Sequence, residues 1–228
     1  MQTIFSEITV GDIDAVRQRV QGNPGSVRSI ATGDSEDFAG YSPLMSALIA
    51  GEFEIAELLL DHGADVDFVD EANWNSYARP VLHDAITAAT LRSLPPRRER
   101  QETAQTSTAS FAILRRMLEQ GANVAAMDSQ GNTSLFRAAG DAWQVLLSSD
   151  LLERLDPEFT TNLARIFELL IAHGADPHHV DLRLGKSVAE LYRGHLIGTF
   201  LDRQGENRFR SASSRKFPTM SGARKLTA

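Results

Sequence analysis

The amino-acid sequence predicts an all-α solenoid, in which helix-turn-helix units stack in a row and short β-hairpin or loop fingers join them. Three observations lead to this prediction. Apolar residues recur at helical spacing in short segments, and these segments come in pairs. A Gly-Ala corner follows the second segment of a pair at residues 63, 121 and 174. One helix pair cannot bury its apolar face alone, so each pair needs neighbours.

The composition fits a folded chain that contains no covalent cross-links. The chain has 228 residues, 42% apolar content, a net charge of −7 and no cysteine. The absence of cysteine excludes disulfides and thiolate metal sites. Residues 1–15 lack a basic start with an apolar segment, and no long apolar run occurs. We therefore expect a cytoplasmic protein without a signal peptide or a transmembrane segment.

The clearest helix pair lies between residues 40 and 67. Ser42 and Pro43 suit the start of a helix, with the serine as the N-cap and the proline in the first turn. Gly51 ends this helix, and Gly63 follows the second helix, where a left-handed cap is needed. The apolar face of the pair is formed by residues at helical spacing, namely Leu44, Ala47, Leu48, Ile55, Ala56, Leu58 and Leu59.

This segment resembles an ankyrin repeat. Ser42-Pro43-Leu44-Met45 corresponds to the family's T-P-L-H opening, and Gly63-Ala64-Asp65-Val66 corresponds to its GADV corner. The departures are Ser for Thr and Met for His. The resemblance implies an ankyrin-repeat domain at residues 1–204 with four to five repeats. Their predicted ranges are a cap at 4–33 and repeats at about 40–67, 79–124, 131–176 and 185–202.

The remaining units are predicted from weaker matches. Residues 4–33 give two short amphipathic helices, which Gly11-Asp12 separates and a turn at Asn23-Pro24-Gly25 ends. The next two units open at Pro80-Val81-Leu82-His83 and at Thr133-Ser134-Leu135-Phe136. We expect a shortened last unit at 185–202, because the final stacked face must be made soluble.

Two repeats contain insertions of equal length. In the repeat at 40–67, 18 residues separate the end of the opening motif from the corner glycine, and in the next two repeats the separation is 38. The equal surplus of 20 residues predicts two lengthened helical hairpins side by side. Prolines at 95–96 and 157 suit the starts of their second helices. Because one insertion is basic and the other acidic, we expect them to face each other.

Residues 205–228 are predicted to be a basic disordered tail, since Arg, Ser, Gly and Lys dominate and no period remains. From residue 203 onward the chain has seven Arg or Lys and one Glu, so the preceding body is more acidic than the net charge suggests. An acidic body repels nucleic acid and favours a basic partner. Binding of nucleic acid or a membrane is therefore not expected of the body.

The resemblance implies a protein that binds another protein through its concave face and its fingers. The candidate contact residues at the fingertips are Phe68, Asp70, Glu71, Trp74, Tyr77, Met127, Asp128, His178 and His179. Trp74 and Tyr77 are the strongest candidates, because exposed aromatic residues are typical interface anchors. The alternative is that these two aromatic residues fold back and shield the next repeat.

The sequence offers no catalytic constellation, and we expect no enzyme activity, no small-molecule substrate, no cofactor and no metal. His62 and His173 precede corner glycines and are expected to interact with helix C-terminal carbonyls. His178, His179 and Asp181 are the best candidates for a metal cluster, but adjacent side chains diverge and the usual ligand spacing is missing. Gly185-Lys186-Ser187 matches only the end of a phosphate-binding loop.

Two alternative functions remain open from the sequence. An acidic scaffold suits a bacterial immunity protein that neutralises a toxin, for example by mimicking nucleic acid. The basic tail suits contacts with nucleic acid or an anionic membrane. Six residues would supply those contacts, namely Arg208, Arg210, Arg215, Lys216, Arg224 and Lys225.

Overall fold

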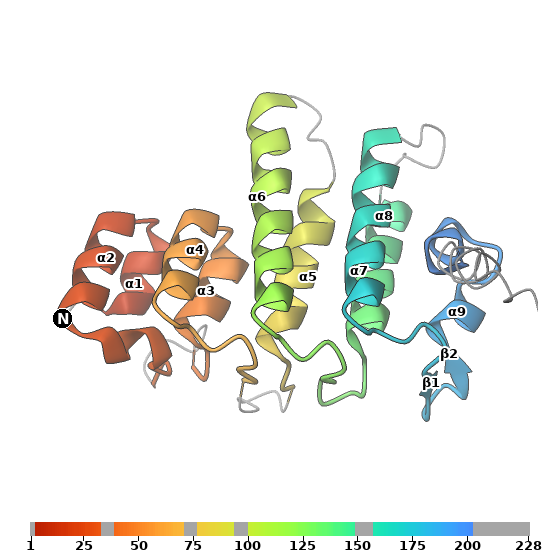
Figure 1. Ribbon diagram of the computed structural model, residues 1–228, viewed down its shortest axis with the longest axis horizontal. Helices are drawn as coiled ribbons and strands as arrows, with labels where there is room; N and C mark the ends of the chain where they lie inside the picture. The colour runs from red at the N-terminus through yellow and green to blue at the C-terminus, as the bar shows by residue number, and fades with distance from the viewer. Residues whose placement is uncertain (1–2, 33–38, 71–76, 94–99, 149–156, 203–228) are drawn as a thin grey trace, which may run out of the picture.

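The protein is a row of helical hairpins stacked side by side (Figure 1). The computed structural model describes residues 3–32, 39–70, 77–93, 100–148 and 157–202. The predicted tail and the tips of several predicted loops lie outside these ranges. Within them, no helix is both long enough and apolar enough to cross a membrane.

The first hairpin pairs α1 (Ile4–Thr9) with α2 (Ile13–Gly22), and a short 3-10 helix, η1 (Pro24–Arg28), follows. Its two helices begin as the sequence dictates. The side chain of Thr3 accepts a hydrogen bond from the Ser6 N–H, and that of Asp12 accepts one from the Ala15 N–H. Each cap satisfies a backbone donor that the first turn leaves free.

The second hairpin pairs α3 (Pro43–Ala50) with α4 (Phe53–Asp61). The predicted cap is confirmed, because the Ser42 hydroxyl accepts a hydrogen bond from the Met45 N–H at 3.2 Å. Gly51 ends α3 in the left-handed conformation. The three corner glycines at 63, 121 and 174 all have positive φ and therefore occupy equivalent bends.

The third and fourth hairpins are longer than the first two, as the insertions predict. Helix α5 (Val81–Arg92) pairs with α6 (Arg100–Glu119), and α7 (Ser134–Ser148) lies beside α8 (Pro157–Ala172). Figure 1 shows their upper ends rising above the shorter hairpins. Helix α8 begins at the expected proline, whereas residues 95–96 lie outside the described ranges.

The predicted pairing of opposite charges between the two insertions is not made by Arg92 or Asp141. Arg92 lies next to Gly51, at the end of α3 in the preceding hairpin. Asp141 lies against α5, where its Oδ2 is 2.7 Å from the Thr87 hydroxyl. The reason is helical register, because Arg92 emerges on the face of α5 that is turned toward α3. Asp150, Glu153 and Asp156 lie outside the described residues, and Glu158 lines a small pocket together with Ser107, Thr108 and Phe111 of α6.

The last unit consists of a β-hairpin with two residues in each strand, followed by two short helical segments. Strands β1 (Val180–Asp181) and β2 (Lys186–Ser187) are antiparallel and lead into α9 (Val188–Leu191), and residues 196–202 are again helical. A capping box fixes the start of α9, since the hydroxyl of Ser187 accepts from the Glu190 N–H while the Glu190 carboxylate accepts from the Ser187 N–H.

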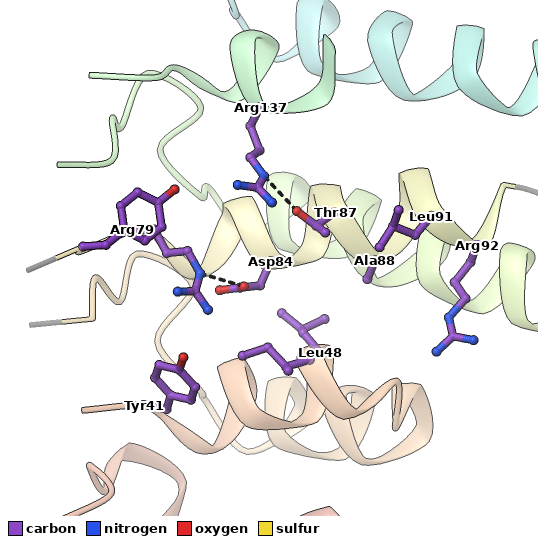
Figure 2. Close-up of a pocket in the computed structure, with 11 residues that line it drawn as sticks. Tyr41, Leu48, Arg79, Asp84, Thr87, Ala88, Leu91, Arg92 and Arg137 are labelled. Carbon is purple, nitrogen blue, oxygen red and sulfur yellow. Dashed lines mark hydrogen bonds and ion pairs between the residues drawn. The ribbon is translucent and has the colours of Figure 1, made fainter. Parts of the chain in front are cut away.

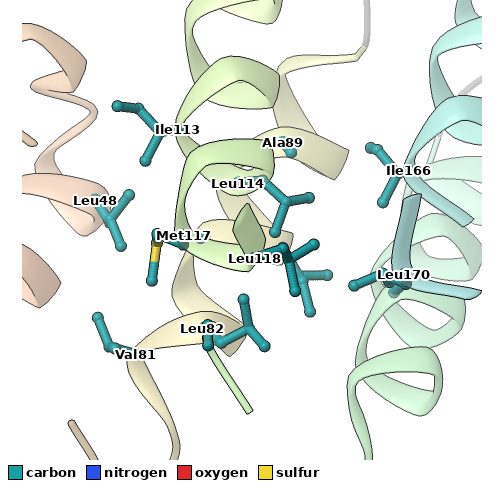
Figure 3. Close-up of a cluster of buried hydrophobic side chains, with 14 of the residues drawn as sticks. Leu48, Val81, Leu82, Ala89, Ile113, Leu114, Met117, Leu118, Ile166 and Leu170 are labelled. Carbon is teal, nitrogen blue, oxygen red and sulfur yellow. The ribbon is translucent and has the colours of Figure 1, made fainter. Parts of the chain in front are cut away.

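The core is continuous along the row. An inner layer of α1, α3, α5, α7 and α9 forms contacts between successive members, and α2, α4 and α6 form an outer layer in the same way. Figure 3 shows the centre of this core, where buried side chains of α6 meet those of α3, α5 and α8. The labelled residues are Leu48, Val81, Leu82, Ala89, Ile113, Leu114, Met117, Leu118, Ile166 and Leu170. Each hairpin thus buries its apolar face against its neighbours.

Candidate protein-binding groove

A groove with a volume of about 430 Å³ lies between the inner helices α3, α5 and α7 and the finger before α5 (Figure 2). The groove residues come from four places: α3 with the residue Tyr41 before it, the finger before α5, one face of α5, and α7. Helix α5 contributes residues 84, 87, 88, 91 and 92, whose helical spacing places them on one side. The lining consists of Tyr41, Leu48, Ile49, Tyr77, Arg79, Asp84, Thr87, Ala88, Leu91, Arg92 and Arg137.

Arg79 holds together the end of the groove that lies next to the finger before α5. Its Nε donates to Asp84 Oδ1 at 2.9 Å, and its Nη1 lies 3.5 Å from Asp70 Oδ2. The guanidinium carbon lies 5.4 Å from the ring centre of Tyr41 and 5.9 Å from that of Tyr77. Burial raises the pKa of Asp84 to about 6, although Arg79 opposes this rise. The arginine therefore joins two hairpins and one finger at a single point.

Arg137 joins α7 to α5 in the same groove. Its Nε–H lies between Thr87 Oγ1 at 2.9 Å and Asp141 Oδ2 at 3.0 Å. Burial raises the pKa of Asp141, and the nearby Arg137 and Thr87 oppose that shift. The polar groups on the groove floor are thus bonded to one another, which fixes the positions of both helices.

Apolar and cationic side chains remain open above this floor. Ile49 is 46% exposed and Leu91 is 48% exposed, although both are large and apolar. Arg92 is also exposed, and Figure 2 shows its side chain directed from α5 toward α3. Half-exposed apolar residues beside fixed cations are the features of a surface that binds another molecule.

One family matches the chain in a comparison with known protein families. The family is described as Ankyrin repeat, and it matches residues 39–71, which include α3 and α4. The protein is an ankyrin-repeat protein. A search of curated proteins found no match.

In this ankyrin-repeat protein, two of the predicted contact residues lie inside the fingers. Asp70 is buried against Arg79, and Asp128 is buried in the finger that precedes α7. Tyr77 is half-buried and donates its hydroxyl hydrogen to Asp128 Oδ2 at 2.8 Å. Asp128 also accepts hydrogen bonds from the backbone of Gln130 and Asn132. Asp128 therefore links two neighbouring fingers, whereas Asp70 holds Arg79 within its own finger.

The other predicted contact residues are spread along the ankyrin-repeat stack. Phe68 packs partly on the core, and Met127 is about half exposed. His178 is exposed on the last finger and His179 is half-buried there. Glu71 and Trp74 lie outside the described residues. The structure therefore brings Tyr77 and Asp128 together, whereas the two histidines belong to the last finger.

The histidines of the last finger are not part of a metal cluster among the residues that the structure describes. The carboxylate of Asp181 is engaged by Arg183, whose Nη2 lies 2.7 Å from Asp181 Oδ2. The two corner histidines behave as the sequence predicts, since His62 Nδ1 lies 2.8 Å from the Leu58 carbonyl oxygen and His173 Nδ1 lies 2.9 Å from that of Leu169.

Sequence reasoning missed most of the groove. The residues that it did not single out as contacts are those of the inner helices, such as Asp84, Thr87 and Leu91. Their signal was present, because they recur at intervals of three and four residues along a helix whose other side is apolar. Arg79 carried no such signal, since its partners come from distant segments.

Proposed function

We propose that the chain is a non-enzymatic protein-interaction module that binds a partner protein in the groove and along the adjacent fingers. The observation that carries this proposal is the pairing of two half-exposed apolar residues, Ile49 and Leu91, with a bonded polar floor in a cavity of about 430 Å³. An ankyrin repeat at residues 39–71 supports it, since such repeats commonly bind proteins.

A rigid floor favours binding for a thermodynamic reason. Arg79 and Arg137 are each held by at least two partners, so little side-chain freedom remains to be lost when a partner docks. Burial of Ile49 and Leu91 would then contribute about 1.5–3 kcal/mol for each side chain that becomes fully covered. The two alternatives from the sequence have no comparable support, and the tail residues lie outside the described ranges.

Affinity capture with matched variants tests the proposal. Wild-type protein is compared with Ile49→Asp and Leu91→Asp, which place a charge in the groove. Val10→Asp is the control, because Val10 is 75% exposed and is not a groove residue. We expect one partner to be retained by the wild type and the control and lost by both groove variants, with unchanged melting curves. Capture of the same partner by all four proteins would refute binding in the groove.

Trp74→Ala is added as a fifth protein, because Trp74 is the predicted finger anchor. Loss of the partner in this variant as well would extend the binding surface to the fingers. If Trp74→Ala alone lost the partner, the binding site would lie on the finger and not in the groove.

A further inference from the structure

We propose that the groove selects partner segments in which a carboxylate side chain lies next to a bulky apolar one. This inference rests on the proposed function and states which partner chemistry the same site takes. It is the opposite of the basic partner that the net charge of −7 predicts. The observation that carries it is the depth at which the groove places its positive and negative charges.

Arg79 and Arg137 form three ion pairs within the described residues, with Asp70, Asp84 and Asp141, and in each pair the arginine is nearer the solvent than its carboxylate. The side chain of Arg137 is 29% exposed and that of Asp141 is 14% exposed. The side chain of Arg79 is 15% exposed and that of Asp84 is 10% exposed. A docked partner therefore meets guanidinium groups first. Burial also raises the pKa of both aspartates, which reduces their negative charge toward acidic pH.

Arg92 adds a cation without a matching anion. Asp70, Asp84 and Asp141 balance Arg79 and Arg137, whereas Arg92 forms no ion pair with any residue in the described ranges. Its guanidinium lies at the C-terminal end of α3, where a Cβ on Gly51 would be 2.7 Å from Arg92 Nη2. The partial negative charge of the helix end favours a cation there. Arg92 is therefore held at the edge of the groove, within the same cavity as Ile49 and Leu91.

The local charge outweighs the net charge of the chain at contact distance. At physiological ionic strength, charges separated by more than about 8 Å are largely screened. A carboxylate that docks beside Arg92 and Arg137 is within that distance of both guanidinium groups, and Asp141, which pairs with Arg137, is less exposed than the arginine. The acidic body slows the approach of an acidic partner, and the groove arginines decide how long the partner stays bound.

Selection of short random peptides on the full chain tests this inference. The probes are the enriched peptides themselves, resynthesised with a fluorophore, and their dissociation constants are measured by anisotropy. We expect enriched sequences to contain Asp or Glu beside Leu, Ile, Phe or Trp. We expect Arg92→Glu to weaken such a peptide by about fivefold to tenfold, as for a close charge pair at an interface, and Arg92→Lys to weaken it less.

Arg115→Glu is the matched control, since Arg115 is an exposed arginine of α6 that pairs with Glu119 and is not a groove residue. This variant is expected to bind the peptide as the wild type does. A further expected result is that peptides selected on Arg92→Glu itself contain Lys or Arg in place of the acidic residue. Higher salt should weaken the acidic peptides on the wild type.

The outcomes separate this inference from the proposed function. Enrichment of basic or uncharged peptides that Ile49→Asp still abolishes would refute the acidic preference and leave groove binding intact. Enriched peptides that bind Ile49→Asp and Leu91→Asp as well as the wild type would refute binding in the groove. A selection that enriches no peptide would overturn both.

Discussion

At the residue scale, glycines of this chain are required for two different physical reasons. Gly121 has a φ of +94°, and a Cβ built there would meet nothing within 4 Å. Gly198 has no such backbone conformation, but a Cβ there would lie 2.3 Å from the Tyr192 carbonyl oxygen. The first position is restricted by backbone strain and the second by space.

Gly121→Val is expected to lower the free energy of unfolding by more than about 1 kcal/mol, because a β-branched residue is strained at positive φ. Denaturant unfolding measures this loss. The matched control is Gly140→Ala in α7, where a Cβ also meets nothing within 4 Å and φ is not positive. That control is expected to raise the free energy of unfolding by about 0.5–1 kcal/mol. An unchanged midpoint for Gly121→Val would contradict the assigned corner.

His83 shows what burial does to an ionisable residue in this fold. It is fully buried in α5, beside the backbone of Ala126. Burial lowers the pKa of His83 to about 4, and the neighbouring Arg137 and Arg79 act in the same direction. The carboxylate of Asp128 and the backbone of Ala126 oppose this shift.

The lowered pKa of His83 predicts that the protein becomes less stable as the pH falls. The neutral ring stabilises the fold fully above pH 6.5, and that stabilisation is lost as the pH falls through 4, because the unfolded state then binds a proton that the folded state resists. The loss amounts to at most about 3 kcal/mol. His83→Met, which copies Met45 of the preceding repeat, is expected to remove this dependence. Urea unfolding between pH 7 and pH 4 measures it, and identical slopes for both proteins would refute it.

At the element scale, the fingers form a linked series and not a set of independent loops. Tyr77 is bonded to Asp128, Asp128 to Asn132, and Asn132 to Arg183 of the last finger. Two hydrogen bonds support the same link, one from the Ser129 N–H to the Ala78 carbonyl oxygen and one from the Ala78 N–H to the Ser129 hydroxyl. These contacts join three fingers, so a substitution in one finger is expected to alter the packing of the next.

Tyr77→Phe is expected to destabilise the protein by about 1 kcal/mol, since it removes one hydrogen bond to a carboxylate that keeps its other donors. Tyr192→Phe is the control, because the Tyr192 hydroxyl forms no hydrogen bond within the described ranges and should change stability little. Burial also raises the pKa of Tyr77 to about 12, so its ultraviolet titration should lie well above that of an ordinary tyrosine. Equal stability losses in the two variants would contradict the link.

The helices of this fold were predictable from the sequence because their signals are local. The groove was not predictable, because its contacts join segments that are distant in the sequence. Ser42, the corner glycines and the apolar spacing act within a few residues of themselves, so local chemistry specifies them. The spacing surplus likewise predicted the long third and fourth hairpins. Arg79, by contrast, meets Tyr41 and Asp84 only after two hairpins have stacked. The predicted charge pairing between the insertions is not made by Arg92 or Asp141, because composition does not determine which face of a helix carries a charge.

At the scale of the whole molecule, stability should be a sum of contacts between successive hairpins. The inner helices contact one another in chain order, from α1 to α9, and the ends of the row have one neighbour each. The C-terminal unit is joined to the row partly by Trp143 of α7, whose ring meets Tyr192 at 6.0 Å and His195 at 5.2 Å. Such a chain is expected to open from its ends.

Trp143→Ala should therefore loosen one end of the protein and leave the other unchanged. Hydrogen exchange followed by mass spectrometry is expected to lose protection mainly at residues 188–201, because the lost aromatic contacts join that unit to α7. Ile8→Ala is the mirror control, since Ile8 is fully buried in α1 and its loss should expose residues 4–22 instead. If either variant lowered protection equally along the whole chain, the row would unfold as one cooperative unit, and nearest-neighbour stacking would not describe it.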